Sequence, residues 1–236
     1  MNFSQIVMVP GLLSTGEVYR PTIDALGSDV FVAETRLDDT IEAMARRLLD
    51  EASGRFLLCG HSMGGYVALE VLRLATERVA GLALIATSAR ADMPEQTSVR
   101  RRLVAMAQER GIEAAAQMLE GKLFGPRTGS EALRRLNLAM AREIGAGVFA
   151  RQQAAIIGRR DQRAMLETLA VPTVVLAGTA DAIIPPQRSQ EMAAAIPGAE
   201  LVTLEGIGHM VPLEAPRETA AAVARLQARI SADRRG

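Results

Sequence analysis

The hexapeptide GHSMGG at residues 60–65 sets a serine among three glycines, between an apolar run and an apolar helical pattern. A tight turn from a strand into a helix strains the backbone of its tip residue and exposes that side chain above the sheet. The neighbours two positions away must then be small, as Gly60 and Gly64 are. Gly65 would let the helix pack closely on the strand. The pattern predicts a nucleophilic Ser62, although an isolated match also fits a serine that only caps a helix.

A serine hydroxyl needs a base before it can act as a nucleophile, and the chain has two histidines, His61 and His209. At so sharp a turn the adjacent side chains of His61 and Ser62 should point apart. His209 lies in the segment GIGHMVPLEAP, after the last expected strand. A loop histidine can serve only as a structural hydrogen-bond partner. However, ligands of open α/β sheets bind at the carboxyl ends of the strands, which favours His209 as the base.

A third group should orient the histidine. Asp181 lies in LAGTADAIIPP, just past the fifth expected strand and one strand–helix–strand passage before His209. Turns also favour aspartate as a helix cap, so a structural role is the alternative. The other place for such an acid is after the fourth strand, where no carboxylate occurs before Asp92. We therefore expect Asp181 to orient His209, with Asp92 as the next candidate.

Short apolar runs alternate with helical patterns along the chain. The runs are nearly continuous in apolar residues, which is typical of strands covered on both faces. This alternation predicts an α/β fold with a doubly wound parallel sheet of about six strands. The expected strands are residues 5–9, 29–33, 55–59, 79–86, 172–177 and 200–204, and the helices between them are residues 38–52, 62–76, 186–196 and 214–230.

One stretch breaks the alternation. From about residue 91 to residue 165 the sequence shows helical patterns, punctuated by glycines, and no convincing strand. We expect a helical insertion over residues 91–165 and a core made by residues 1–90 and 166–236. Within the insertion, GAGVFA at residues 145–150 matches a dinucleotide-binding pattern, but a helical pattern precedes it where that motif requires a strand.

Composition limits the partners. Acidic and basic residues number 27 each, so no net field gathers nucleic acid or an anionic membrane surface. Cys59 is the one cysteine, which excludes an internal disulfide and, with two histidines, argues against a zinc site. No secretory signal is evident, and no apolar run approaches the ~18 residues of a membrane span. We expect a cytoplasmic protein without metal or organic cofactor. Its oligomeric state stays open, and a homodimer is compatible with the sequence.

The motifs GHSMGG, GTADAIIP and GHMVPLEAP, in that order, resemble those of the α/β-hydrolase superfamily. Within it the chain resembles the small esterase and enol-lactone hydrolase branch with a helical cap, over essentially its whole length. The resemblance implies a catalytic triad of Ser62, Asp181 and His209 and a cap at about residues 91–165. It also implies an oxyanion hole shared by the backbone N–H of Met63 and that of the residue after the first strand's turn glycine.

The chain departs from its relatives in two places. It lacks the antiparallel strand pair that usually precedes the first parallel strand, so six parallel strands are expected. Pro10 also replaces the histidine that usually braces the loop before the turn glycine, here Gly11. The N–H of Leu12 is the expected oxyanion donor, and Leu13 is the alternative.

The implied reaction is cleavage of a small carboxylic ester or lactone through an acyl-enzyme. Ser62 would attack the carbonyl carbon, His209 would carry the proton to the leaving group, and water would release the acyl group. Two other interpretations share these residues. One is a carbon–carbon bond hydrolase, or a lyase that uses His209 as a base. The other is a non-catalytic receptor for a small ligand.

The substrate pocket is expected in the insertion. The chain has no tryptophan and few aromatic residues, which favours a small aliphatic pocket. An arginine such as Arg100 could bind a substrate carboxylate, although solvated helix faces explain most of the arginines there. The apolar candidates, most of which suit helix packing better than pocket lining, are Met93, Met106, Met118, Leu123, Phe124, Met140, Phe149 and Ile157.

Overall fold

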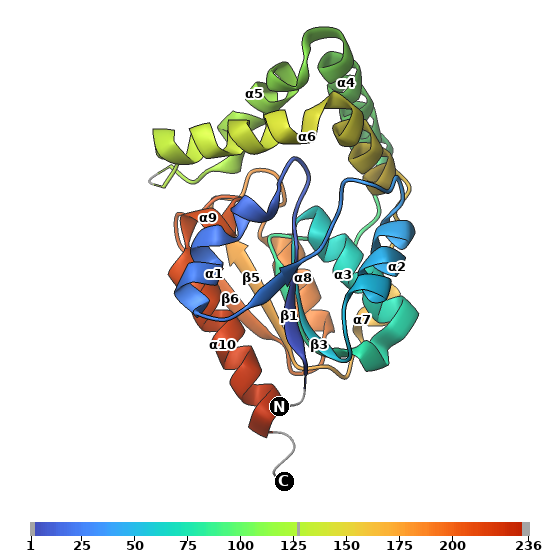
Figure 1. Cartoon of the computed structure of the whole chain (residues 1–236), viewed down its shortest axis with the longest axis vertical. Helices are drawn as coiled ribbons and strands as arrows, with labels where there is room; N and C mark the ends of the chain where they lie inside the picture. Colours follow the sequence, from blue (N-terminus) through green and yellow to red (C-terminus); the bar gives the residue numbers. More distant parts are fainter. Residues whose placement is uncertain (1–2, 127, 233–236) are drawn as a thin grey trace.

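The computed structural model describes residues 3–126 and 128–232 and centres on one six-stranded sheet (Figure 1). The strands follow the order β2-β1-β3-β4-β5-β6, and every neighbouring pair is parallel. The predicted parallel sheet of about six strands is therefore confirmed. The strands are β1 (Gln5–Val9), β2 (Val30–Val32), β3 (Phe56–His61), β4 (Val79–Ile85), β5 (Thr173–Gly178) and β6 (Glu200–Leu204).

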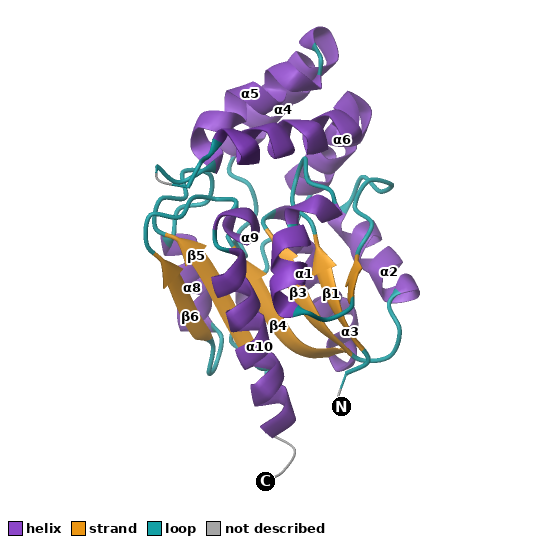
Figure 2. Ribbon diagram, turned by 60° about the vertical axis from the view of Figure 1, so that its left-hand side comes forward, coloured by secondary structure: helices purple, strands orange, loops and turns teal. Residues whose placement is uncertain are grey.

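Helices cover both faces of the sheet (Figure 2). Alternate residues of β1 show why, because Ile6 and Met8 belong to one apolar cluster while Val7 and Val9 belong to the other. One face packs against α1 (Arg20–Leu26) and α10 (Pro216–Ala232), and the other against α2 (Ile41–Glu51), α3 (Met63–Ala75) and α8 (Gln187–Ala195). The short elements are η1 (Gly16–Val18), η2 (Thr76–Arg78), α7 (Arg163–Leu166) and α9 (Val211–Glu214).

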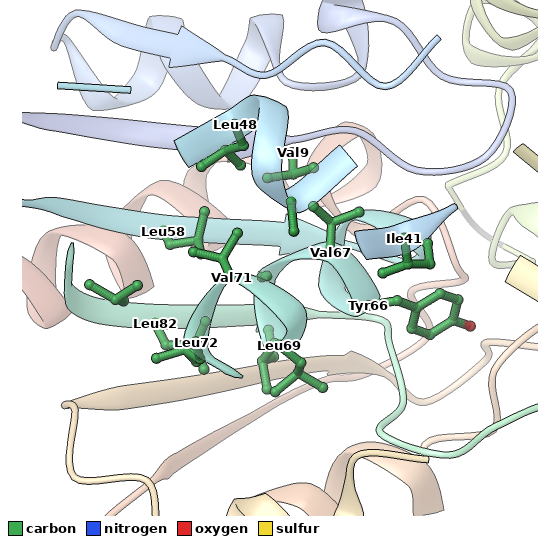
Figure 3. Packing of buried hydrophobic residues seen from close by; sticks show 14 of the residues in the cluster. Val9, Ile41, Leu48, Leu58, Tyr66, Val67, Leu69, Val71, Leu72 and Leu82 are labelled. Carbon is green, nitrogen blue, oxygen red and sulfur yellow. The ribbon is translucent and has the colours of Figure 1, made fainter. Parts of the chain in front are cut away.

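The helix α3 is the most deeply buried of the flanking helices. It directly follows the serine turn, and its residues from Met63 to Leu72 are all buried. Figure 3 shows its apolar side chains between the sheet and α2. This packing fixes the start of the helix relative to the end of β3. The labelled residues are Val9, Ile41, Leu48, Leu58, Tyr66, Val67, Leu69, Val71, Leu72 and Leu82.

The edge strands differ from the central ones. Every residue of β3, β4 and β5 is buried, as expected for strands covered on both faces. In β2 all three residues are half-buried, and in β6 half-buried and exposed residues alternate. The prediction that all six runs are covered on both faces is thus wrong for β2 and β6, because each has a neighbour on one side only. The helix α1 was also missing from the sequence prediction.

Three helices between β4 and β5 form a layer above the carboxyl ends of the strands (Figures 1 and 2). They are α4 (Pro94–Arg110), α5 (Ile112–Leu123) and α6 (Glu131–Ile157), called here the α4–α6 layer. The layer has its own apolar cluster, which includes Leu103, Ile144 and Phe149, and Leu13 of the core joins it. At Gly145 the φ angle of 69° interrupts the helical backbone, so α6 is kinked there.

Among the residues that the structure describes, no helix is long and apolar enough to cross a membrane.

Candidate active site

Ser62 occupies the turn between β3 and α3 with a strained backbone, φ 52° and ψ −116°. Non-glycine residues rarely adopt a positive φ, and such strain persists where the surroundings impose it. Here the Ser62 N–H donates to the carbonyl of Ile85 at 2.9 Å, and the Ser62 carbonyl accepts from Thr87 Oγ1 at 2.7 Å. The end of β4 therefore holds both polar groups of the serine backbone.

The three glycines around Ser62 stand where no side chain fits. A Cβ at Gly64 would overlap the carbonyl of Val9, and a Cβ at Gly60 would overlap the carbonyl of Gly64. A Cβ at Gly65 would overlap the side chain of Thr87. Close approach of backbone segments thus requires glycine on both sides of the serine.

The structure brings together Ser62, His209 and Asp181, from three separate turns at the same end of the sheet. Nδ1 of His209 donates to Oδ2 of Asp181 at 2.8 Å, because a carboxylate can only accept. The other ring nitrogen, Nε2, lies 2.9 Å from the Ser62 Oγ and accepts a hydrogen bond from its hydroxyl. All three residues are buried. The arrangement can remove a proton from the serine hydroxyl and stabilise the imidazolium that results.

Asp181 is itself held by backbone donors. Its Oδ1 accepts hydrogen bonds from the N–H groups of Ile183 and Ile184, both at 2.8 Å. The alternative acid, Asp92, lies elsewhere in the cavity wall and pairs with Arg100 and Arg159. Of the two acids considered, only Asp181 has a hydrogen bond to His209 among the described residues.

His61 is not placed as a base for Ser62. Its Nε2 donates to the backbone carbonyl of His209 at 2.9 Å, and its Nδ1 has no hydrogen-bond partner among the described residues. Burial, together with the positive charge that His209 can carry, lowers the pKa of His61 to about 3. The neutral ring of His61 therefore links the end of β3 to the His209 loop.

The N–H groups of Leu12 and Leu13 differ in what they bond. Leu13, with a φ of 58°, donates to Oε1 of Gln152 at 3.1 Å, so its N–H is already satisfied. The N–H groups of Leu12 and of Met63 have no acceptor within residues 3–126 and 128–232. Of the two alternatives, Leu12 is thus the residue with a free donor beside Ser62.

The loop that carries His209 is fastened to the end of α5. The N–H groups of His209 and Met210 donate to the carbonyl of Leu123, at 2.8 and 3.2 Å. The Glu214 carboxylate accepts from the N–H of Gly208 and of Met210, both at 3.1 Å, and from that of Gly125 at 2.6 Å. It also accepts from the hydroxyl of Thr128. One carboxylate thus ties the base-bearing loop to the α4–α6 layer.

Sequence reasoning missed both Gln152 and Glu214. Glu214 lies within the quoted motif GHMVPLEAP, so an acid five residues after the base was an available signal. Gln152 lies in the middle of a helix and is fully buried. Its partner, the N–H of Leu13, is 139 residues away in the chain. No local pattern could have indicated that contact.

A cavity of about 670 Å³ opens beside Ser62 and His209, between the sheet and the α4–α6 layer. Of the apolar candidates from the sequence, Met93 and Leu123 line it, while Met140 and Phe149 are buried in helix packing. The expected small aliphatic pocket is wrong in one respect, because its wall is rich in guanidinium groups. The arginines that line it are Arg90, Arg100, Arg159, Arg163 and Arg188.

Within the described part of the chain, no group of three or more His, Cys, Asp or Glu residues could hold a metal ion.

The fold and this site define a family. A model of the Alpha/beta hydrolase family matches residues 4–222, and the chain belongs to that family. The resemblance found in the three motifs is thereby confirmed.

Two curated relatives cover about three quarters of this chain. The pimeloyl-[acyl-carrier protein] methyl ester esterase of Nitrosomonas europaea is 29% identical over 189 residues, which are 76% of this chain and 74% of that protein. The dihydrolipoyllysine-residue acetyltransferase component of the acetoin cleaving system of Pseudomonas putida is 32% identical over 206 residues. That match covers 76% of this chain and 50% of the relative, so it spans about half of that protein's length.

Two solved structures are similar over nearly the whole chain. A thermophilic esterase from Thermogutta terrifontis has a TM-score of 0.88 and 26% identity, and the match covers 98% of this chain and 92% of that one. The enol-lactonase from Burkholderia xenovorans LB400 has a TM-score of 0.81 and 25% identity, with 97% and 92% covered.

Proposed function

We propose that the protein is a serine hydrolase that cleaves a small carboxylic ester or lactone through an acyl-enzyme. The observation that carries the proposal is the hydrogen-bonded chain Asp181–His209–Ser62 at the wall of a cavity. At the coarser level, the chain is a hydrolase acting on ester bonds, in keeping with the esterases and the enol-lactonase similar to it.

The geometry supports a two-step reaction. In the first step Ser62 Oγ attacks the carbonyl carbon while Nε2 of His209 takes the hydroxyl proton. His209 then gives that proton to the leaving alcohol, and the acyl group stays on Ser62. In the second step a water molecule gives a proton to His209 while its oxygen attacks the acyl carbon. His209 then returns that proton to Ser62 Oγ as the acyl–oxygen bond breaks, which frees the acid and restores the serine. Throughout, Asp181 holds the Nδ1–H tautomer.

The negative charge on the carbonyl oxygen needs donors in both steps. We assign this role to the free N–H groups of Leu12 and Met63, the second of which opens α3. A helix N-terminus also carries partial positive charge. Each such donor typically contributes about 3 kcal/mol in the transition state.

We also propose that residues 91–165 act as a cap on a core formed by residues 1–90 and 166–236. The support is that the cavity beside Ser62 has one wall from the sheet loops and another from α4, α5 and α6. Under this proposal the cap selects the substrate, while the core supplies the nucleophile.

Labelling with a fluorophosphonate tests the nucleophile. Intact-mass spectrometry should show one adduct on the wild type and none on Ser62→Ala. A matched control is Ser88→Ala, because Ser88 also lines the cavity and is buried but has no histidine partner among the residues that the structure describes. Ser88→Ala should be labelled like the wild type. Equal labelling of Ser62→Ala and the wild type would refute the assignment.

A series of p-nitrophenyl esters of increasing acyl length tests the reaction. The wild type should release p-nitrophenol with an initial burst equal to the enzyme concentration, as expected if acylation outpaces deacylation. Ser62→Ala should show the background rate. A protein that is labelled at Ser62 but cleaves no ester or lactone would instead support carbon–carbon bond cleavage, a lyase or a receptor.

A further inference from the structure

Asp92 forms a buried ionic cluster with two arginines in the wall of the catalytic cavity. Its Oδ2 accepts from Nε of Arg100 at 2.6 Å, and its Oδ1 accepts from Nη1 of Arg159 at 2.6 Å. The side chains of Asp92 and Arg159 are only 1% and 6% exposed, and that of Arg100 is 20% exposed. One carboxylate therefore serves two largely buried guanidinium groups.

This cluster carries an excess positive charge in a place where charge is costly. Buried ions need a partner of opposite sign, because the desolvation penalty is several kcal/mol per ion. Here two positive groups share one negative group, which leaves one positive charge unbalanced. The whole cavity shows the same bias, since five arginines and two aspartates line it. The carboxylates of Glu191 and Asp161 pair with Arg90 and Arg163, so these acids do not supply the missing negative charge.

The cluster also has hydrogen-bond donors without acceptors. Gln153 is fully buried, and its Oε1 accepts from Nη1 of Arg100 at 3.1 Å. Its amide nitrogen Nε2 has no partner in the described part of the chain. The two N–H donors of that amide therefore lack an acceptor among the described residues. A buried donor without an acceptor destabilises the fold, so these donors point to an acceptor that the chain itself does not provide.

The cluster lies close to the reacting atoms. The guanidinium carbon of Arg159 is 4.3 Å from the ring centroid of Tyr66. Tyr66 follows Ser62 by one turn of α3, which is about 6 Å along the helix axis. Ser62, Tyr66 and Gln153 all line the same cavity. A group bound at the cluster and a carbonyl at Ser62 can therefore belong to one small molecule.

We propose that Arg100, Arg159 and Gln153 form a subsite for a carboxylate that the substrate carries a few bonds from its scissile ester. The preferred substrate is then a half-ester of a dicarboxylic acid or a molecule of similar charge and length. A carboxylate supplies the missing negative charge and two acceptor oxygens, and guanidinium groups bind carboxylates through paired N–H donors. This inference rests on the proposed function, because it names the substrate class for the same cavity.

A matched pair of esters tests the subsite. p-Nitrophenyl hydrogen adipate and p-nitrophenyl hexanoate have acyl chains of equal length, but only the adipate ends in a carboxylate. The wild type should have a kcat/KM about tenfold or more higher for the adipate, mainly through a lower KM. The ratio of the two values is insensitive to the fraction of folded enzyme. A ratio near one for the wild type would overturn the inference.

Gln153→Glu places a carboxylate beside Arg100 and so supplies the missing charge from the chain itself. It should lower the adipate-to-hexanoate ratio by about tenfold. Gln153→Leu removes the donor without adding charge and should lower the ratio severalfold, which keeps the test open if the first variant folds poorly. The control is Gln96→Glu, the same change at an exposed residue of the cavity wall. It should keep the wild-type ratio, and an equal loss there would show that any added charge suffices, against the inference.

Calorimetry separates this inference from the proposed function. Monomethyl adipate should bind Ser62→Ala and bind the double variant with Gln153→Glu at least tenfold more weakly. If the wild type cleaves neither ester but this binding difference holds, the proposed function fails and the subsite stands. If the wild type cleaves both esters equally well and the two variants bind alike, the subsite fails and the hydrolase proposal stands.

Discussion

The turn that carries Ser62 and the loop that carries His209 are held by different kinds of contact. Around Ser62, backbone segments approach so closely that Gly60 and Gly64 leave no room for a Cβ. The partners of the Ser62 backbone are Ile85 at the end of β4, Thr87 just after it, and Gly65 in α3. The His209 loop is held by hydrogen bonds, from its own N–H groups to Leu123 in α5 and to the Glu214 carboxylate. Ser62 is thus fixed by the sheet and α3, whereas His209 depends also on the α4–α6 layer.

The turn at Leu12 and Leu13 resembles the His209 loop in this respect. Gln152 of α6 accepts from Leu13 and donates through Nε2 to the carbonyl of Thr35 at 3.3 Å. A side chain of the α4–α6 layer therefore bridges the proposed oxyanion turn to the loop after β2. We therefore expect that a mutation in the α4–α6 layer alters catalysis without contacting Ser62.

The largest effect on activity should come from changing Asp181, the acid that holds His209 in line with Ser62. Asp181→Asn should lower kcat by about 10³–10⁴-fold, because the amide no longer enforces the Nδ1–H tautomer of His209. Steady-state kinetics on a p-nitrophenyl ester and circular dichroism would measure activity and fold. Asp161→Asn is a control in the same cavity, without a histidine contact, and should stay within about twofold of the wild type. Near-wild-type turnover in Asp181→Asn would place the acid elsewhere.

The next largest effect should come from the glycines that surround Ser62, called here the glycine cradle (Gly60, Gly64 and Gly65). Gly64→Ala should remove most of the activity and lower the unfolding free energy by about 1–3 kcal/mol, because its Cβ would overlap the carbonyl of Val9. Gly121→Ala is the control, since Gly121 lies in α5 with nothing within 4 Å of an added Cβ. Alanine favours helices over glycine by up to about 1 kcal/mol, so Gly121→Ala should be neutral or stabilising. Equal melting temperatures for the two variants would show that the cradle is not tight.

A smaller effect should follow from loosening the oxyanion turn through α6. Gln152→Leu should lower kcat by about tenfold with little change in KM, because it removes the acceptor of the Leu13 N–H and lets the neighbouring Leu12 donor shift, while Met63 stays in place. Losing an oxyanion donor outright costs about 10²–10³-fold, and a displaced donor costs less. The separation of kcat from KM distinguishes positioning from a general packing defect. An unchanged kcat would mean that the core alone fixes this turn.

The smallest effect concerns how stability depends on pH, through the imidazole ring of His61, which bonds the His209 loop to the end of β3. The pKa of His61 is lowered to about 3 by burial, against an ordinary value of 6.5. Between these values the unfolded chain binds a proton that the folded chain does not, so stability falls as the pH drops below about 6.5. The slope approaches about 1.4 kcal/mol per pH unit. His61→Gln should flatten it, as measured by denaturant unfolding from pH 7 to pH 5. Parallel slopes for the wild type and the variant would contradict this origin.

The sequence was sufficient to predict the parallel sheet and the three residues that the structure brings together at the carboxyl ends of its strands. Ser62 was predictable because the glycines around it are local and have few other uses. His209 followed by elimination from two histidines, and Asp181 by its place after a strand. The central strands were predictable because continuous apolar runs report burial on both faces. That argument failed at β2 and β6, since an apolar run cannot tell whether it has one neighbour or two.

The contacts that fasten the site were not predictable, because they join segments far apart in sequence. The Leu13–Gln152 hydrogen bond depends on where α6 crosses the sheet, and no periodicity records that position. Single arginines such as Arg100 were considered as ligands of a substrate carboxylate, but the arginine-rich wall as a whole was missed for a related reason. Arg100 looks like an ordinary charged residue of α4, and Arg159 lies just after the end of α6. Only the fold shows that both turn inward to share Asp92.

The bond between α5 and the His209 loop has a consequence for how this protein can be redesigned. The turn of the α4–α5 hairpin, at Gly111, is unconstrained, because an added Cβ there would meet nothing within 4 Å. The end of the hairpin, at Leu123 and Gly125, is tied to the amides around His209. A designer who exchanges the hairpin at Gly111 can change the residues that α4 and α5 present to the cavity, such as Leu103 and Leu119, while the hydrogen bonds that hold His209 are kept. A splice at Leu123 would change specificity and turnover together.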